Sequence, residues 1–253
     1  MLCVPEGKAD IIIPGEVAVS IRISAALASI LIFGLFAPTA LAFKAGDVIL
    51  RAGPITVDPN GVGSDPLKIN GVSLSGTKVE SIDSDTQLGV TGVYMFKDYF
   101  GLELLVATPF NHTIKADGLQ GLGIRKVGDV DQLPPTLSAL FYPVGYSNPD
   151  SRFQPYVGLG INYTIFWDED ASSQLEDAFG EKFSMDVDNT WGIAGRAGFD
   201  YMITDNILFN ASVWYINMET EAKFKGKSSG TRIKAKGVEI DPWVYTIGIG
   251  YRF

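Results

Sequence analysis

Hydrophobic and polar residues alternate with a period of two at the C-terminal end of the chain, the pattern of a β-strand with two different faces. One face is apolar and aromatic, and the other is small or polar. Segments 87–96, 157–165 and 191–201 repeat the alternation with Gly, Thr and Asn on the minority face. The large residues of the C-terminal strand are Trp243, Tyr245, Ile247, Ile249, Tyr251 and Phe253.

Weaker alternation occupies four further segments, which brings the expected number of strands to eight. These segments lie at about 46–57, 100–114, 130–142 and 206–218. No run after residue 42 reaches the roughly 20 apolar residues that a membrane-spanning helix needs. The fold class that this pattern predicts is all-β.

The composition of the two strand faces favours a barrel in a membrane. A soluble sandwich buries its apolar faces in one core and turns polar faces to water. Here the minority face is rich in Gly and small polar residues, which suit the crowded interior of a narrow closed barrel, while the apolar face suits lipid. We therefore expect an eight-stranded antiparallel transmembrane β-barrel, too narrow for a general aqueous pore.

The connections between the expected strands alternate in length, as they do in outer-membrane barrels. Segments 58–85, 115–129, 166–189 and 219–238 are long, and segments 97–99, 143–152 and 203–206 are shorter. The short connections carry turn residues such as Asp98 and Asn206. This order predicts four long extracellular loops, three short periplasmic turns and both barrel ends in the periplasm, in the outer membrane of a Gram-negative bacterium.

Composition agrees with this interpretation. Hydrophobic residues make up 46% of the 253 residues and charged residues 19%, which excludes intrinsic disorder. The mean hydropathy is nevertheless only +0.16, too low for a bundle of membrane-spanning helices. The net charge of −9 argues against a nucleic-acid partner, whose phosphates attract basic proteins.

The N-terminal region has the order of a secretory signal peptide. Arg22 is followed by an apolar run, by Pro38 and by the small-residue site Ala40-Leu41-Ala42. We expect residues 1–42 to be removed, with 1–19 a spurious upstream extension, and 43–253 to form the barrel. An N-terminal membrane anchor is the alternative. The single cysteine, Cys3, lies in the removed part, so the mature chain has no disulfide.

Many short segments of the chain resemble, in order, the outer-membrane protein W (OmpW) family. The resemblance covers nearly all of 43–253. The segments that carry it are Lys44–Asp47, Arg51–Gly53, Asp85–Gly89, Gly101–His112, Leu133–Leu137, Phe153–Thr164, Trp191-Gly192, Ser212–Tyr215 and Asp241–Val244.

The resemblance implies a passive channel whose narrow apolar lumen admits small hydrophobic or amphipathic molecules and releases them sideways through the barrel wall. It implies that Leu105 and Trp214 constrict the lumen and that Pro109, with Phe110 at the entrance, marks the lateral opening. Strand parity places Leu105 on the same face as Glu103, and Trp214 on the same face as Ser212. The alternative is that both side chains merely plug a filled barrel.

Pro109 has a physical argument of its own. Proline has no N–H and cannot donate to a strand ladder, so it weakens a closed wall where it stands. The alternative is that the third strand has already left the membrane at residue 109.

No chemistry beyond passage is expected. His112, the only histidine, lies near a loop without a nucleophile motif, so we predict no enzyme activity. The acidic segment 168–188 has Ser173 and Phe179 where an EF-hand needs Gly and Glu, so it predicts a solvated loop and no metal. No cofactor is expected.

The remaining partners are lipids and proteins of the outer membrane. The basic segment 223–236 would face lipopolysaccharide phosphates if its loop is external, although simple solvation is the alternative. Phe253, an aromatic last residue, is typical of strands that the barrel-assembly machinery recognises. The rival function is a structural or adhesive barrel with a filled lumen, whose loops serve as a receptor for phage, toxins or host surfaces.

Overall fold

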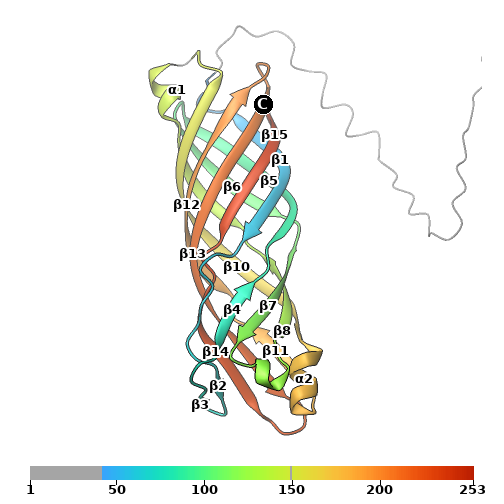
Figure 1. The fold of residues 1–253 in the computed structure, drawn as a ribbon. Helices are drawn as coiled ribbons and strands as arrows, with labels where there is room; N and C mark the ends of the chain where they lie inside the picture. The colour runs from blue at the N-terminus through green and yellow to red at the C-terminus, as the bar shows by residue number, and fades with distance from the viewer. Residues whose placement is uncertain (1–41, 149) are drawn as a thin grey trace, which may run out of the picture. The chain divides into compact units, whose positions relative to one another are not determined.

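The computed structural model describes residues 42–148 and 150–253, and within them eight strands close into one antiparallel ring (Figure 1). Each strand pairs with the next, and the last pairs with the first. The predicted fold is confirmed. In ring order the strands are β1 (Val48–Asp58), β5 (Asp85–Lys97), β6 (Phe100–Ala107), β9 (Thr136–Phe141), β10 (Phe153–Ala171), β12 (Thr190–Met202), β13 (Ile207–Gly226) and β15 (Trp243–Arg252).

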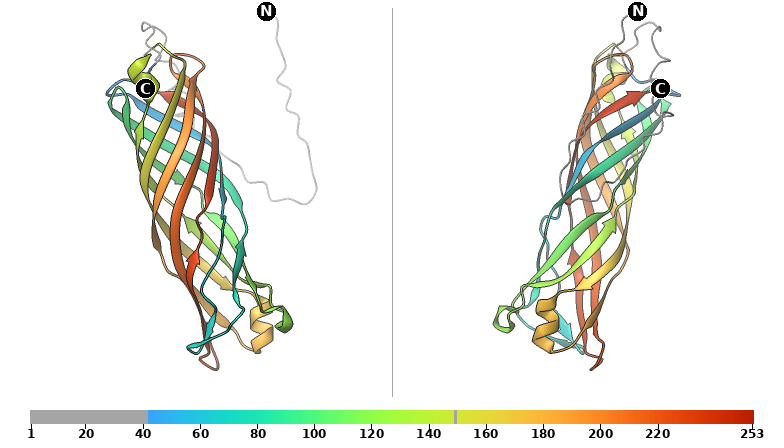
Figure 2. Two further views of the ribbon diagram at one scale, coloured as in Figure 1. Left: turned by 60° about the vertical axis from the view of Figure 1, so that its left-hand side comes forward. Right: turned by 90° about the vertical axis from the view of Figure 1, so that its right-hand side faces the viewer.

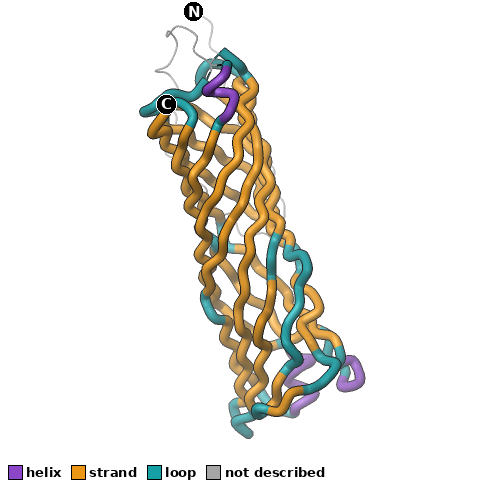
Figure 3. Tube along the Cα trace, turned by 90° about the vertical axis from the view of Figure 1, so that its left-hand side faces the viewer, coloured by secondary structure: helices purple, strands orange, loops and turns teal. Residues whose placement is uncertain are grey.

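At one end the connections are the short turns expected, with the small helix α1 (Pro143–Ser147) and the C-terminus beside them (Figures 1 and 3). Among the described helices, none combines the length and apolar composition needed to cross a membrane. The predicted signal peptide lies, apart from Ala42, outside the described residues.

At the other end the wall continues far past the ring, which the sequence did not predict (Figure 2). The long connections contain further strands that pair with one another and with the ends of β10 and β13. They are β2 (Lys68–Ile69), β3 (Val72–Ser73), β4 (Lys78–Ile82), β7 (Phe110–Asp117), β8 (Lys126–Leu133), β11 (Phe183–Val187) and β14 (Arg232–Glu239), with the short helices η2 (Gln120–Leu122) and α2 (Ser173–Phe179). The long loops are thus folded, and we call these strands and helices, with the paired ends of β10 and β13, the outer extension.

The two faces of the ring are those the alternation predicts. Leu159, Ile193 and Trp191 are about 70% exposed on the outside, where only lipid can cover so much contiguous apolar surface. Their strand neighbours Asn162 and Arg196 are buried inside. The ring is therefore inverted relative to a soluble protein, with its apolar belt outside and polar groups within.

Prolines interrupt two neighbouring strands at the boundary between ring and extension. Strand β6 ends at Ala107 and its continuation β7 starts after Pro109, while β8 and β9 are separated by Pro134 and Pro135. The β6–β9 ladder ends at the pair Leu105 and Thr136, and the β7–β8 ladder begins at Phe110 and Gln132. No ladder pair joins the two strands between these points.

Glycines set how closely the first and last strands approach. The β1–β15 ladder skips Gly53 and Pro54, which face Ile247 and Gly248. A Cβ atom at position 53 would stand 2.7 Å from the Gly248 Cα and still closer to the Ile247 carbonyl oxygen. The closing seam therefore depends on the missing side chain.

We expect Gly53→Ala to destabilise the closed ring by about 1–3 kcal/mol, because the backbones of β1 and β15 must move apart. Heat-modifiable migration in SDS gels would measure the folded fraction after refolding. Gly195→Ala on β12, where an added Cβ meets nothing within 4 Å, is the matched control. Equal folding of both variants would contradict the importance of the seam.

Candidate functional site

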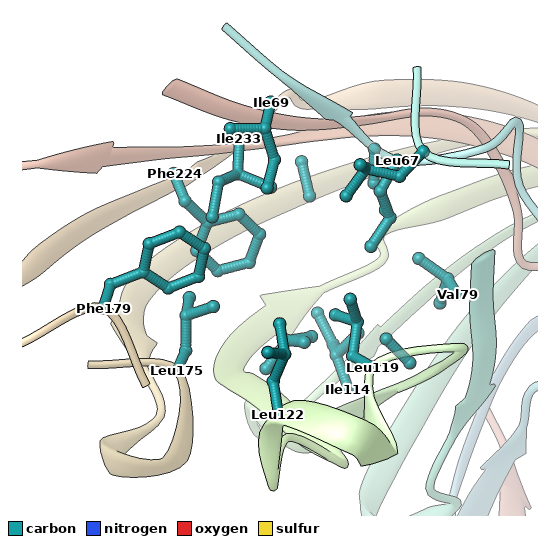
Figure 4. A pocket seen from close by; sticks show the side chains of 15 residues that line it. Leu67, Ile69, Val79, Ile114, Leu119, Leu122, Leu175, Phe179, Phe224 and Ile233 are labelled. Carbon is teal, nitrogen blue, oxygen red and sulfur yellow. The ribbon is translucent and has the colours of Figure 1, made fainter. Parts of the chain in front are cut away.

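The outer extension encloses an apolar cavity, which we call the outer chamber (Figure 4). Its walls come from the connecting strands, and the short helices η2 and α2 contribute Leu122, Leu175 and Phe179. Every residue that lines it is apolar, so water gains no hydrogen bond there. The other lining residues are Leu67, Ile69, Leu74, Val79, Ile114, Ala116, Leu119, Val127, Ala222, Phe224, Ile233 and Ala235.

A second cavity, the inner chamber, adjoins the first. The two share Val79, Ile114 and Ala222, so they follow one another through the extension. Each holds about 30 Å³, room for about two water molecules. A larger solute therefore needs side chains or loops to move. The remaining lining of the inner chamber is Pro59, Ile82, His112, Val130, Gln132, Phe166, Val187, Thr220, Val238 and Ile240.

Leu105 and Trp214 lie on opposite walls of the ring and both point inward. Leu105 is on β6 and Trp214 on β13, four positions apart in the ring of eight. Their side chains are 3% and 1% exposed and belong to one buried apolar cluster that also contains Phe110. The strand parity expected from the sequence places both correctly. Their role as a constriction stays a prediction.

Pro109 and Phe110 point in opposite directions. Pro109 is exposed on the outside of the wall, whereas the Phe110 side chain is fully buried inside. The Thr108 N–H donates to Leu88 O and the Asn111 N–H donates to the Asp85 carboxylate, both on the β5 side. The inward-facing residues are odd-numbered in β6 and even-numbered in β7, so the chain shifts by one residue around Pro109. The Pro135 carbonyl accepts from the Tyr163 N–H on the β10 side. Pro109 and the Pro134-Pro135 segment thus flank one gap in the ladder between the neighbouring strands.

A buried charge network that the sequence did not predict closes the lumen beneath Trp214. Arg51 of β1 pairs with Glu103 of β6 at 2.6 Å and with Asp200 of β12 at 2.5 Å. Arg196 of β12 forms an ion pair with the second carboxylate oxygen of Glu103. The four residues, which we call the charged floor, are at most 6% exposed and sum to zero net charge.

Neutral side chains complete the charged floor. The Arg51 guanidinium donates to the Tyr142 hydroxyl at 2.7 Å, and the Asn210 amide donates to Asp200 at 2.8 Å. Arg196 lies against the Trp214 ring, 3.8 Å from its centroid, a cation–π contact. Trp214 therefore covers the charged floor with its indole, and that indole faces the apolar chambers.

A second apolar layer seals the short-turn end of the lumen. It consists of side chains that are at most 2% exposed. Two successive layers therefore close the lumen toward the periplasm: the charged floor and, beyond it, this layer of packed side chains. The members of this layer are Phe43, Ile49, Val93, Met95, Leu140, Tyr142, Tyr156, Met202 and Leu208.

His112 is a strand residue, as the expected segment 100–114 implies, and its side chain is buried and points inward. It lies on β7, above the outer lipid-facing belt, because its strand neighbours Asn111 and Lys115 face solvent or polar partners. Burial lowers the pKa of the His112 imidazole, although the nearby carboxylates of Asp83 and Asp85 oppose the shift. The ring is therefore neutral at pH 7.

Comparison with known proteins supports the architecture. A family model described as OmpW family matches residues 44–253. Outer membrane protein W of Vibrio cholerae is 40% identical over 84% of this chain and 91% of its own length. The crystal structure of OprG from Pseudomonas aeruginosa is 47% identical, covers 85% of this chain and 99% of its own, and superposes with a TM-score of 0.77.

A more distant solved structure shares the fold alone. The solid-state NMR structure of outer membrane protein AlkL in DMPC lipid bilayers is 21% identical. It covers 86% of this chain and 95% of its own, with a TM-score of 0.60.

Glu103→Gln should lower the free energy of unfolding by about 3–5 kcal/mol, because it leaves an unbalanced buried positive charge in the charged floor. Urea unfolding in lipid micelles would measure it. The double variant Glu103→Gln with Arg196→Met restores zero net charge and should recover much of the loss. Lys115→Gln, at an exposed pair with Asp83, should cost less than about 1 kcal/mol.

If the double variant is no more stable than Glu103→Gln alone, charge balance does not stabilise the charged floor.

Stability should fall as the pH drops below about 6.5, the pKa of histidine in an unfolded chain. The folded pKa of His112 is lower, so between the two values the unfolded chain binds more protons and stability rises with pH. One such group gives a slope of at most about 1.4 kcal/mol per pH unit. The free energy of unfolding in urea is measured for the protein and for His112→Gln at pH 7.5 and at pH 5.5. The change in their difference between the two pH values is the contribution of His112. A constant difference would contradict a neutral buried His112.

Proposed function

The chain belongs to the OmpW family and is a β-barrel of the Gram-negative outer membrane, and from this premise we propose that it is a passive channel for small hydrophobic or amphipathic molecules. The observation that carries the proposal is the succession of apolar chambers from the outer end down to Trp214. Transfer of an apolar solute from water into such a lining is favourable without a reaction or an energy source.

The route is proposed to turn sideways above the charged floor. A solute that reaches Leu105 and Trp214 meets a cap over buried ion pairs, and breaking these would leave charges uncompensated. The gap in the wall at Pro109, Pro134 and Pro135 lies beside this cap, since Leu105 is the last β6 residue in the ladder. Phe110 forms the inner side of this exit.

Contacts outside the lumen fit an outer-membrane setting. On the β13–β14 hairpin, Lys225 faces Arg232 across the strands, a repulsive arrangement that an anionic group would relieve. The neighbouring Lys223 and Lys234 already pair with Asp188 and Glu221. We propose that lipopolysaccharide phosphates lie beside Lys225 and Arg232. Phe253, 55% exposed at the end of β15, is proposed as the contact of the barrel-assembly machinery.

Pro109→Ala should slow uptake of a hydrophobic solute about 2–10-fold, because it restores a backbone donor at the gap in the ladder. The assay adds N-phenylnaphthylamine to intact cells that lack other family members. The rate of uptake is the rate at which the fluorescence of the dye rises as it enters phospholipid. Pro143→Ala in α1, at the short-turn end, is the matched control and should not change the rate.

In the same assay Trp214→Ala uncovers the Arg196 guanidinium and should also reduce uptake, whereas Trp214→Phe keeps an apolar cover and should retain most of it. Unchanged uptake in both Pro109→Ala and Trp214→Ala would refute the assigned route. No uptake beyond that of cells without the protein would favour the structural or adhesive rival.

A further inference from the structure

The inner chamber contains a polar pair on an otherwise apolar wall. Among the described residues that line it, the polar side chains are His112, Gln132 and Thr220. The Thr220 hydroxyl is already engaged, since it donates to the Asp188 carbonyl at 2.5 Å. His112 and Gln132 are only 2% and 4% exposed, so any polar group they leave unpaired faces the chamber or the protein interior.

The hydrogen bonds of His112 fix its protonation. Its Nδ1 lies 2.6 Å from the backbone carbonyl oxygen of Asp83, which can only accept, so Nδ1 carries the proton. The neutral ring then has an acceptor at Nε2. The Gln132 amide nitrogen lies 2.8 Å from Nε2 and donates to it. The backbone of Asp83 thus orients the amide of Gln132 through the imidazole.

This orientation leaves the other half of the Gln132 amide free. One of its N–H groups is used by His112, while its second N–H and its carbonyl Oε1 have no hydrogen-bond partner among residues 42–148 and 150–253. Covering such an acceptor without giving it a partner costs about 1–3 kcal/mol. Gln132 lines the chamber, and a group inside the chamber can therefore meet it.

The pair is held rigidly at the inner end of the passage. The Phe110 ring stacks on the His112 ring, with centroids 6.2 Å apart and planes inclined by 16°. In the β7–β8 ladder Gln132 lies opposite Phe110, and His112 lies opposite Val130, so the pair spans the two strands diagonally. Phe110 belongs to the same apolar cluster as Leu105 and Trp214.

We propose that Gln132, oriented by His112, is a specificity-determining residue that favours apolar solutes carrying one hydrogen-bonding group, such as a hydroxyl. An apolar solute that fills the chamber excludes water from the Gln132 amide and leaves Oε1 unpaired. A solute of the same size with a hydroxyl donates to Oε1 and removes that cost. The proposal rests on the proposed function, because it requires solutes to pass through the chamber.

The test compares two solutes of similar shape, 1-naphthol and 1-methylnaphthalene, which differ in one hydroxyl. Initial uptake of each labelled compound is measured in intact cells with and without the protein, and each rate is corrected for the protein-free rate. Gln132→Leu keeps the size of the side chain and removes its hydrogen bonds. We expect it to lower the naphthol-to-methylnaphthalene ratio about 5–10-fold, the effect of one net hydrogen bond.

Two further variants separate selectivity from folding. Gln120→Leu makes the same exchange at an exposed residue of η2 and should leave the ratio unchanged. His112→Phe keeps an aromatic ring but no longer orients the amide, and it should lower the ratio by a smaller factor. Heat-modifiable migration confirms that each variant is folded, and Gln132→Met replaces Gln132→Leu if the latter does not fold.

The outcomes distinguish this proposal from the one it rests on. If neither compound enters faster with the protein than without it, the passage itself is refuted. If both enter faster but Gln132→Leu and Gln132→Met leave the ratio unchanged, the passage stands and the selective role of Gln132 is overturned. Equal slowing of both compounds would assign the pair a purely structural role in joining β7 and β8, which also overturns it.

Discussion

The wall of this protein obeys one constraint: inside a bilayer, every backbone N–H and C=O must find its partner within the protein. Closing eight strands into a ring satisfies that constraint, and the close approach of Gly53 to β15 is part of the closure. Prolines are the exception, because a missing donor leaves a gap without leaving an unsatisfied N–H. The proposed exit at Pro109, Pro134 and Pro135 uses such a gap, where no ladder pair has to be broken.

The interior follows a second rule, that buried charge must be balanced. The charges of Arg51, Arg196, Glu103 and Asp200 cancel one another, and their ion pairs link three strands of the wall, β1, β6 and β12. Above them the two chambers are lined mainly by apolar side chains. The Trp214 indole lies between these chambers and the charged floor, because its ring packs against the Arg196 guanidinium and belongs to the apolar cluster. This division makes the lumen a pocket that opens outward and not a tube through the membrane.

Much of this could be predicted from sequence because strand parity is a local property. Alternation identified the eight strands, their outward faces and the inward direction of Leu105 and Trp214. The outer extension was missed because its added strands are only two to eight residues long, too short for alternation to stand out. The charged floor was missed because strand parity predicts only that Arg51 and Asp200 point into the barrel. It does not predict that both side chains lie at the same level along the barrel axis. The inward direction of His112 was not predicted, because the inward-facing positions shift by one residue between β6 and β7.

The length of β13 has a consequence for where a solute is first captured. From Tyr215, at the edge of the lipid-facing belt, the strand continues to Gly226, roughly 35 Å along its axis. The hydrocarbon core of a bilayer is only about 30 Å thick. The apolar chambers therefore lie beyond the lipid-facing belt, and the proposed function would use them to offer an oily solute an apolar lining before it reaches the bilayer.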